Sequence, residues 1–204
     1  LLRSRSLDEE DFTAKEALQT SSFWYLSISI MARSLVSGGV GLHLVPFFIG
    51  LGASPVSAAA LAGSVGVMSI PGRFGLSYLG DFVNRRYMMS VSLVFMTIAI
   101  LLLSGVQSIK ASIIPILVYS ISQGGTSVIP QALIADYFGR SAFATISGFR
   151  SMVQMIGIII GPIVSGFVYD NTGSYQLAFL GFAVGSLFSA ILVLMARPPV
   201  RSRL

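Results

Sequence analysis

The chain has 204 residues, of which 54% are hydrophobic and 10% charged, and its mean hydropathy is +0.83. This balance excludes an ordinary soluble domain and is typical of a membrane protein. With no cysteine and a single histidine, disulfides, thiol catalysis and Cys-ligated metals are excluded, and neither a metal nor a cofactor is expected. The net charge of +5 is carried largely between apolar stretches, so no nucleic-acid partner is expected.

Apolar stretches long enough to cross a bilayer as helices, which takes about 20 residues, occur six times. We therefore expect an all-α membrane protein, with a cytoplasmic segment at residues 1–20, a six-helix bundle at 21–196 and a basic cytoplasmic tail at 197–204. The expected spans are residues 22–44, 56–79, 88–103, 112–135, 143–168 and 175–195. A turn within PFFIGLGASP joins the first two, which form a helical hairpin.

The positions of Lys and Arg predict the orientation, because positively charged loops stay in the cytoplasm. Nine basic residues flank the spans on one side, whereas only Lys110 does so on the other. Both termini are therefore expected in the cytoplasm, with a plasma or inner membrane as the default location. The first 24 residues have no short apolar core followed by a small-residue cleavage site, so we expect no signal peptide and read the chain as one entered midway.

The stretch SYLGDFVNRR, which follows the second span, resembles the signature loop of the major facilitator superfamily, Gly-x-Leu-x-Asp-(Arg/Lys)-x-Gly-Arg-(Arg/Lys). Asp81, Arg85 and Arg86 match, while Ser77 and Asn84 replace the two glycines. Serine is small, and asparagine tolerates left-handed backbone, so the turn can form. The resemblance implies a cytoplasmic latch in which the aspartate accepts hydrogen bonds at a helix terminus and the arginines hold adjacent spans. The alternative is a charged turn that matches by chance.

A second stretch, GFRSMVQMIGIIIGPIVSG in the fifth span, is similar to the glycine-rich motif of the same family, G-x8-G-x3-G-P-x-x-G-G. It supplies Gly148, Gly157, Gly161, Pro162 and Gly166, with a serine in place of one glycine. Small residues let helix backbones approach closely, and proline bends a span. We expect helix packing here rather than a specific role in exchange.

With both motifs in place, the chain resembles helices seven to twelve of a twelve-helix transporter, the C-terminal half, built as two inverted three-helix repeats. HLVPFF, PGRFGLSYLGD and GPIVSGFVYDNTGSYQLAF look most like the monocarboxylate and oxalate/formate branch. This implies a small organic anion as substrate, a proton or counter-anion for coupling, a lipid bilayer around the protein and an N-terminal six-helix half as partner. Where the branch often has an aspartate in helix eight, this chain has Ser69.

Arg33, Arg73 and Arg150 fall inside the expected spans, and no acidic residue lies well inside any span. An intramembrane arginine is unfavourable unless it faces a cavity, a partner or an anion, so all three are candidate substrate-binding residues, together with Ser69. By resemblance, Arg73 holds the position of the substrate-carboxylate arginine. The alternatives are structural pairing for Arg73, an ion pair with the other half for Arg33, and snorkelling to the interface for Arg150.

Two further residues complete the candidate substrate site. Gln123 lies on a polar face of the fourth span, which either lines a cavity or makes hydrogen bonds between helices. His43 lies near the outer end of the first span, where it either couples protons or is a hydrogen-bonded structural residue.

The sequence thus predicts a secondary active transporter that moves a small carboxylate by alternating access, with Arg73 contacting the carboxylate in bidentate geometry. An enzyme is not expected, because the chain offers neither a nucleophile–base pair nor a metal cluster. Two alternatives stay open: a transporter of a neutral solute or drug, and a truncated half without flux of its own.

Overall fold

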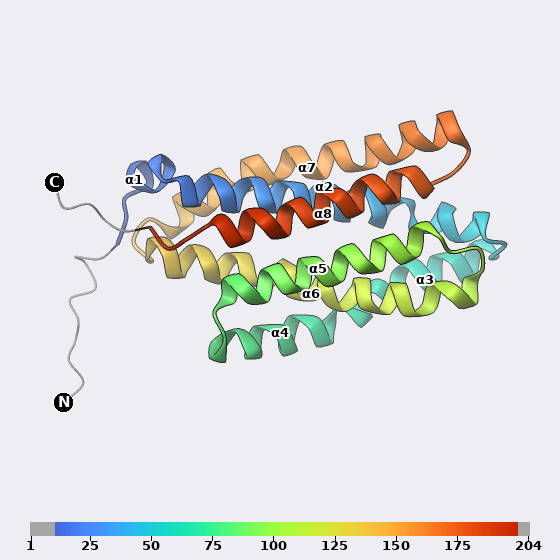
Figure 1. Ribbon diagram of the computed structural model, residues 1–204, viewed down its shortest axis with the longest axis horizontal. Helices are drawn as coiled ribbons and strands as arrows, with labels where there is room; N and C mark the ends of the chain where they lie inside the picture. Colours follow the sequence, from blue (N-terminus) through green and yellow to red (C-terminus); the bar gives the residue numbers. More distant parts are fainter. Residues whose placement is uncertain (1–10, 200–204) are drawn as a thin grey trace.

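The structure is a computed structural model that describes residues 11–199, apart from the side chains of Ser77 and Asp81. The described residues form helices joined by short turns, without strands. The helices are α1 (Ala14–Gln19), α2 (Ser21–Gly50), α3 (Pro55–Met68), α4 (Ile70–Phe82), α5 (Arg85–Ser104), α6 (Ile109–Phe138), α7 (Phe143–Thr172) and α8 (Gln176–Met195). Figure 1 shows the long helices running side by side, with α1 and the last turn of α8 at the same end of the bundle.

Six helical stretches are long and apolar enough to cross a membrane, which confirms the expected all-α membrane fold. The second stretch is divided into α3 and α4, which meet at Ser69. Pro71 explains this break, because proline has no N–H to donate and its ring clashes with the carbonyl of the residue four positions earlier. The first stretch continues to Gly50, beyond its expected end at residue 44, so that Pro46 lies within α2 and the turn begins only at Leu51.

The helices contact one another in two equivalent sets of three. α2 packs against α7 and α8, α6 packs against α4 and α5, and α5 packs against α8. In Figure 1, α8 (red) accordingly lies between α2 and α5. Exchanging α2 with α6, the α3–α4 pair with α7, and α5 with α8 converts one set of contacts into the other. This is the relation expected of two inverted three-helix repeats, as in half of a major facilitator fold.

Glycines set the distance between α2 and α7. A Cβ on Gly157 or Gly161 would overlap the backbone of α2, so only glycine permits this approach. A Cβ on Gly148 would meet nothing within 4 Å, and one on Gly166 only His43, at 3.8 Å. Nine residues turn a helix by roughly two and a half turns, so Gly148 faces away from the side that carries Gly157. Close packing, expected of all these glycines, therefore occurs at the two central ones and not at Gly148.

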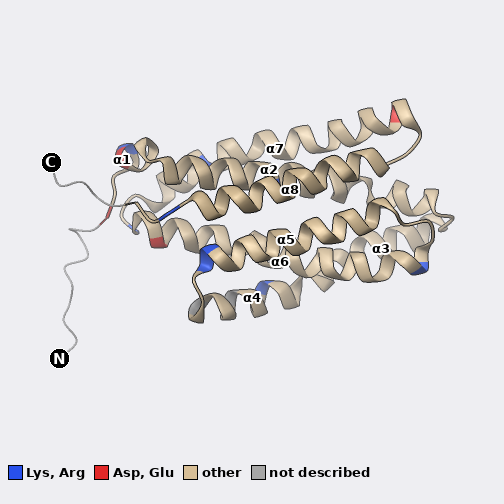
Figure 2. Ribbon diagram, in the orientation of Figure 1, with Lys and Arg blue, Asp and Glu red and all other residues tan. Residues whose placement is uncertain are grey.

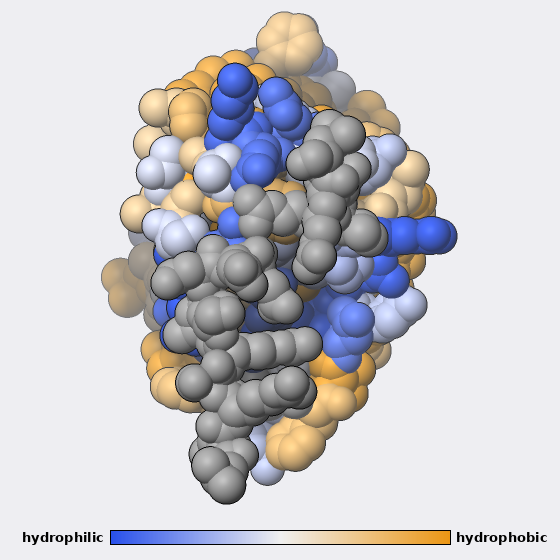
Figure 3. Space-filling view, turned by 90° about the vertical axis from the view of Figure 1, so that its left-hand side faces the viewer, coloured by the Kyte–Doolittle hydropathy of each residue, from blue (hydrophilic) through white to orange (hydrophobic). Residues whose placement is uncertain are grey.

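Charged residues gather at the ends of the bundle, as Figure 2 shows. Lys15, Arg85, Arg140 and Arg197 lie in or beside the helix ends that share the side of α1, whereas Lys110 is in the first turn of α6 at the opposite end. Viewed onto the first of these ends, hydrophilic side chains occupy much of the surface and hydrophobic ones surround them (Figure 3). The middle of the bundle is left almost uncharged, which makes the arginines inside it conspicuous.

Candidate functional site

Arg33 links the first helices of the two repeats. It lies near the middle of the 30-residue helix α2 and is only 7% exposed. Its Nε donates to Thr126 Oγ1 at 3.1 Å, and its Nη2 donates to Gln123 Oε1 at 3.0 Å and to the Gln123 carbonyl at 3.4 Å. Both partners belong to the middle of α6. Arg33 and Gln123, two of the predicted site residues, are therefore in direct contact.

Arg73 lies at the same level on the other side of α6. A Cβ on Gly124 would be 2.9 Å from the backbone nitrogen of Arg73, which places Arg73 beside the residue that follows Gln123. The side chain of Arg73 is exposed and makes no hydrogen bond or ion pair with any described residue. Arg73 thus presents a guanidinium that the described half does not use.

Arg150 lies on the face of α7 that is turned toward the bundle and is 4% exposed. Its Nη1 donates to Gln154 Oε1 at 3.0 Å and its Nη2 to Ser151 Oγ at 3.2 Å. Its Nε is buried without an acceptor among the described residues. The head group of Arg150 is therefore held by side chains of its own helix.

No described carboxylate balances these three charges. The acidic side chains that the structure describes lie at the helix ends or before α1, and they are Asp11, Glu16, Asp136 and Asp170. Nor do the described residues contain a cluster of His, Asp and Glu that could hold a metal ion. A region of positive charge with low-dielectric walls concentrates anions, so the middle of the bundle is chemically suited to an anionic ligand.

Ser69 and His43 lie outside this cluster of donors. Ser69 is 1% exposed, and its hydroxyl donates to the Gly66 carbonyl of its own helix at 2.7 Å. His43 lies ten residues beyond Arg33, about 15 Å along the helix. Its Nε2 lies 3.1 Å from the Pro162 carbonyl and its Nδ1 lies 3.1 Å from the Tyr175 hydroxyl. Since a carbonyl only accepts, Nε2 carries a hydrogen and donates it to Pro162.

The basic residues of the signature loop contact two other helices. Arg85 Nη1 donates to both carboxylate oxygens of Asp136 on α6, at 2.8 and 2.9 Å. Arg86 reaches the Ala196 carbonyl at the end of α8 at 3.5 Å and lies over the ring of Tyr87, 5.0 Å from its centroid. The side chain of Asp81 lies outside the described part of the structure, so its predicted hydrogen bonds stay a prediction.

A docked segment before α2 was missed in the sequence. The Asp11 carboxylate accepts hydrogen bonds from the backbone N–H groups of Ser141 and Arg140, at 2.8 and 2.9 Å. These bonds hold the Asp11 pKa below its ordinary value. The backbone N–H of Phe12 donates to the Phe138 carbonyl at 3.0 Å. The segment is therefore fixed to the α6–α7 loop. The capping box Thr13-x-x-Glu16 is the sequence signal that would have predicted α1.

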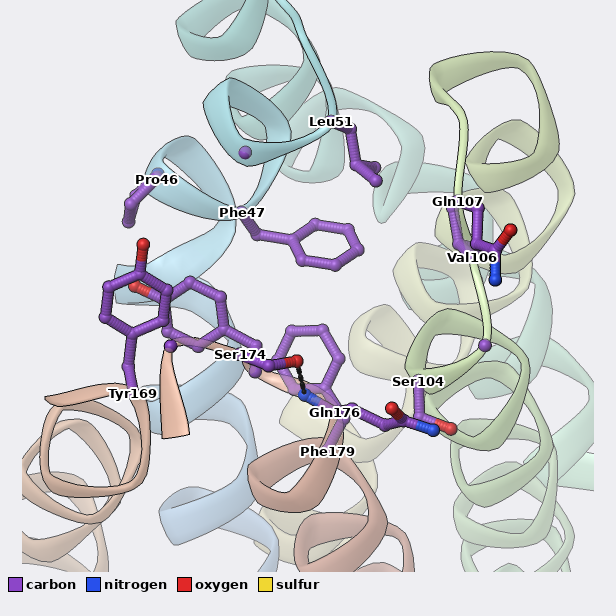
Figure 4. Close-up of a pocket in the computed structure, with 14 residues that line it drawn as sticks. Pro46, Phe47, Leu51, Ser104, Val106, Gln107, Tyr169, Ser174, Gln176 and Phe179 are labelled. Atoms are coloured by element: carbon purple, nitrogen blue, oxygen red, sulfur yellow. Dashed lines mark hydrogen bonds between the residues drawn. The ribbon is translucent and has the colours of Figure 1, made fainter. Parts of the chain in front are cut away.

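A separate cavity of about 290 Å³ lies at the other end of the bundle, between the end of α2, the α5–α6 turn and the α7–α8 turn. Figure 4 shows Phe47 and Phe179 on one side and Gln107 on the other. The ring of Tyr175 stacks on that of Tyr169, with centroids 4.4 Å apart. No charged residue lines this cavity. Its chemistry thus differs from that of the arginines.

Comparison with known proteins identifies the family. The model of the Major Facilitator Superfamily matches residues 18–204. The chain is 25% identical to monocarboxylate transporter 12 of Rattus norvegicus over 88% of this chain and 38% of that protein. It is 27% identical to monocarboxylate transporter 13 of Bos taurus, over 88% of this chain and 44% of that protein. It is 24% identical to monocarboxylate transporter 2 of Rattus norvegicus, over 76% of this chain and 32% of that protein.

The chain thus spans less than half the length of these relatives. The matched model covers nearly all of the membrane-spanning part, and the six helices have the contacts of two inverted repeats. The protein is a multi-pass integral membrane protein that belongs to the major facilitator superfamily of transporters.

Proposed function

We propose that this protein is a secondary active transporter of a small organic anion, and that Arg73 contacts the carboxylate of that anion. The observation that carries the proposal is the exposed guanidinium of Arg73, which lies halfway along the bundle and has no partner among the described residues. A planar guanidinium matches a carboxylate with two parallel hydrogen bonds, which provides both attraction and orientation. The names of the relatives, monocarboxylate transporters, favour the same class of substrate.

Arg33 and Arg150 act in this proposal mainly through their charge. Their head groups are held by Gln123, Thr126 and Gln154, whereas the donors of Arg73 are free to bind a substrate. The site lies at mid-depth, where alternating access requires it, because such a site can open to either side as two halves rock. The second half would be an N-terminal six-helix unit packed against the apolar, exposed faces of α4 and α7. A proton or a counter-anion would supply the coupling.

The signature loop would stabilise one of the two access states. The contacts of Arg85 with α6 and of Arg86 with the end of α8 hold the same end of the bundle together. We assign this end, which carries most of the basic residues, to the cytoplasm of a plasma or inner membrane. Asp81 would complete this latch.

Uptake of radiolabelled mono- and dicarboxylates into proteoliposomes that contain the full-length protein tests the proposal. We expect saturable uptake of at least one acid, which Arg73→Gln abolishes. Arg140→Gln is the matched control, because Arg140 is an exposed arginine at the end of the bundle. Undiminished uptake by the Arg73 variant would show that the carboxylate does not bind there.

A neutral solute is the second candidate, and the uncharged aromatic cavity of Figure 4 favours it. A cavity near 300 Å³, with four aromatic side chains and two glutamines among its lining residues, is at the lower end of the size range of ligand pockets. The same vesicles distinguish the candidates, since uptake of a neutral solute would be insensitive to Arg73→Gln. In separate vesicles that contain residues 1–204 alone, binding without uptake would indicate a half without flux of its own.

A further inference from the structure

His43 is the single histidine of the chain and lies where three segments of the bundle meet. Its partly buried ring on α2 has Nε2 3.1 Å from the Pro162 carbonyl of α7 and Nδ1 3.1 Å from the hydroxyl of Tyr175, the residue before α8. A Cβ on Gly166 would be 3.8 Å from the Cε1 atom of the ring. The imidazole therefore packs along one turn of α7, between Pro162 and Gly166.

The two hydrogen-bond partners allow this ring to change its charge without losing a bond. The Pro162 carbonyl accepts from Nε2 in both charge states, because Nε2 carries a hydrogen in each. The Tyr175 hydroxyl can both donate and accept. It can therefore donate to Nδ1 of a neutral ring and accept from Nδ1 of an imidazolium, with the same two atoms in contact. A second carbonyl or a backbone N–H in its place would favour one charge state alone.

The other charged and titratable groups at this end of the bundle are few. α3 and α8, which pack against α2, contain none. The described ones on the remaining neighbours are Tyr169, Asp170, Tyr175 and Lys110. Asp170 lies one helical turn beyond Gly166, on the face of α7 that carries the imidazole. Arg33, the cation on the helix of His43 itself, is about 15 Å away along the axis. A carboxylate thus shares the face of α7 on which an imidazolium would lie.

Tyr175 also connects the ring with water. It lines the cavity of about 290 Å³ at this end of the bundle, which has ample room for water molecules (Figure 4). Histidine is the side chain that ordinarily changes charge between about pH 5 and 8. A proton that arrives through the cavity would bind to the lone pair of Nδ1, and the Tyr175 hydroxyl would turn from donor to acceptor.

We propose that His43 binds the proton that is coupled to anion transport, and that Tyr175 keeps the ring hydrogen-bonded in both charge states. The inference rests on the proposed function, because the coupled solute is the anion of that transporter, and it selects a proton over a counter-anion. A charged ring attracts an incoming anion, and by reciprocity the bound anion strengthens proton binding. Loss of either one then favours loss of the other, as cotransport requires.

Uptake by the full-length protein in proteoliposomes, measured from about pH 5.5 to 8, tests this inference. The probes are radiolabelled oxalate, glyoxylate and 2-oxobutanoate, which stay largely ionised over this range. Uptake by protein-free vesicles is subtracted, because undissociated acids cross a bilayer unaided. The KM of the parent should fall at least about fivefold toward the acidic limit. His43→Gln keeps a side-chain amide that can donate and accept but does not titrate, so its KM should be independent of pH.

Two tyrosine variants separate the partner of His43 from its surroundings. Tyr175→Phe should weaken proton binding about three- to tenfold and shift the profile to lower pH, because the hydrogen bond of an imidazolium is stronger than that of a neutral ring. Tyr169→Phe is the matched control, since its hydroxyl belongs to the same cavity but bonds to no described residue. It should leave the profile in place.

A second readout does not depend on uptake. The ¹³Cε1 resonance of His43, identified as the one missing from the spectrum of His43→Gln, should titrate over the same pH range as KM. Thermal unfolding shows whether each variant folds. If His43→Gln does not, the titration is followed in the parent and in Tyr175→Phe, with the resonance identified as the one that this variant shifts.

Three results would overturn the inference and leave the proposed function standing. They are a parent KM that does not vary with pH, an unchanged profile in His43→Gln, and a His43 resonance that does not titrate in this range. Absence of uptake of every acid by the parent refutes the proposed function, and the inference falls with it.

Discussion

A methyl group at Gly161 is expected to force α7 away from α2. The Cβ of Gly161→Ala would overlap the Leu35 carbonyl and would lie 2.8 Å from the backbone nitrogen of Gly39. Ordinary van der Waals contact begins at 3.4 Å, so relieving the contact with this nitrogen alone requires the two backbones to move apart by about 0.6 Å. Both obstructing groups are backbone atoms of a long helix, so neither can turn aside as a side chain can.

The expected destabilisation lies toward the upper end of the overpacking range, about 3 kcal/mol. For a unit of this size, that lowers the unfolding temperature by roughly 6–12 °C. Intrinsic fluorescence of Trp24 during heating of the purified protein in detergent measures this change without any thiol-reactive dye. The chain has no cysteine, so such a dye would have nothing to label.

Gly148→Ala is the matched control on the same helix. Its Cβ would meet nothing within 4 Å in the described residues. Replacing glycine by alanine inside a helix there should stabilise the protein by about 0.5–1 kcal/mol through the lower backbone entropy of the unfolded chain. The two substitutions should therefore change the free energy of unfolding in opposite directions. Equal losses at the two positions would refute the reasoning, because the cost would then come from the residue type and not from contact with α2.

Two further outcomes are expected. Gln123→Leu should lower stability by about 1.5–3 kcal/mol, since it deprives a buried charge of a hydrogen bond, and adding Arg33→Met should restore much of that loss in the same melting assay. Loss that persists in the double variant would contradict this. Because the folded Asp11 pKa is lowered, the docking of this carboxylate is fully present above its ordinary value of 3.8 and is lost as the pH falls through the lower folded value. Hydrogen exchange at the Arg140 and Ser141 amides, corrected for intrinsic rates, should show this acid-dependent step, and Asp11→Asn should abolish it.

The number and order of the spans could be predicted because bilayer thickness imposes a long apolar run on every crossing helix. The break at Ser69 could not, because a proline within a span bends, breaks or leaves it nearly straight according to what packs around it. Pro46 and Pro162 lie inside continuous helices, while Pro71 follows the junction of α3 and α4. The docking of Asp11 could not be predicted from the sequence either, because it joins residues about 130 positions apart.

The arginines show the same limit at the candidate site. The sequence placed Arg33 inside the first span and Gln123 on a polar face of the fourth, but it could not show that the two side chains meet. In the structure Arg33 is bonded to Gln123, whereas Arg73 has no hydrogen bond among the described residues. The two arginines therefore have different roles in the proposed function. An arginine fixed by hydrogen bonds to Gln123 and Thr126 keeps its position whichever side of the membrane is open, so it is suited to supply a constant field. An arginine without such bonds can bind and release a substrate without breaking contacts in its own half, and this favours Arg73 for the direct contact.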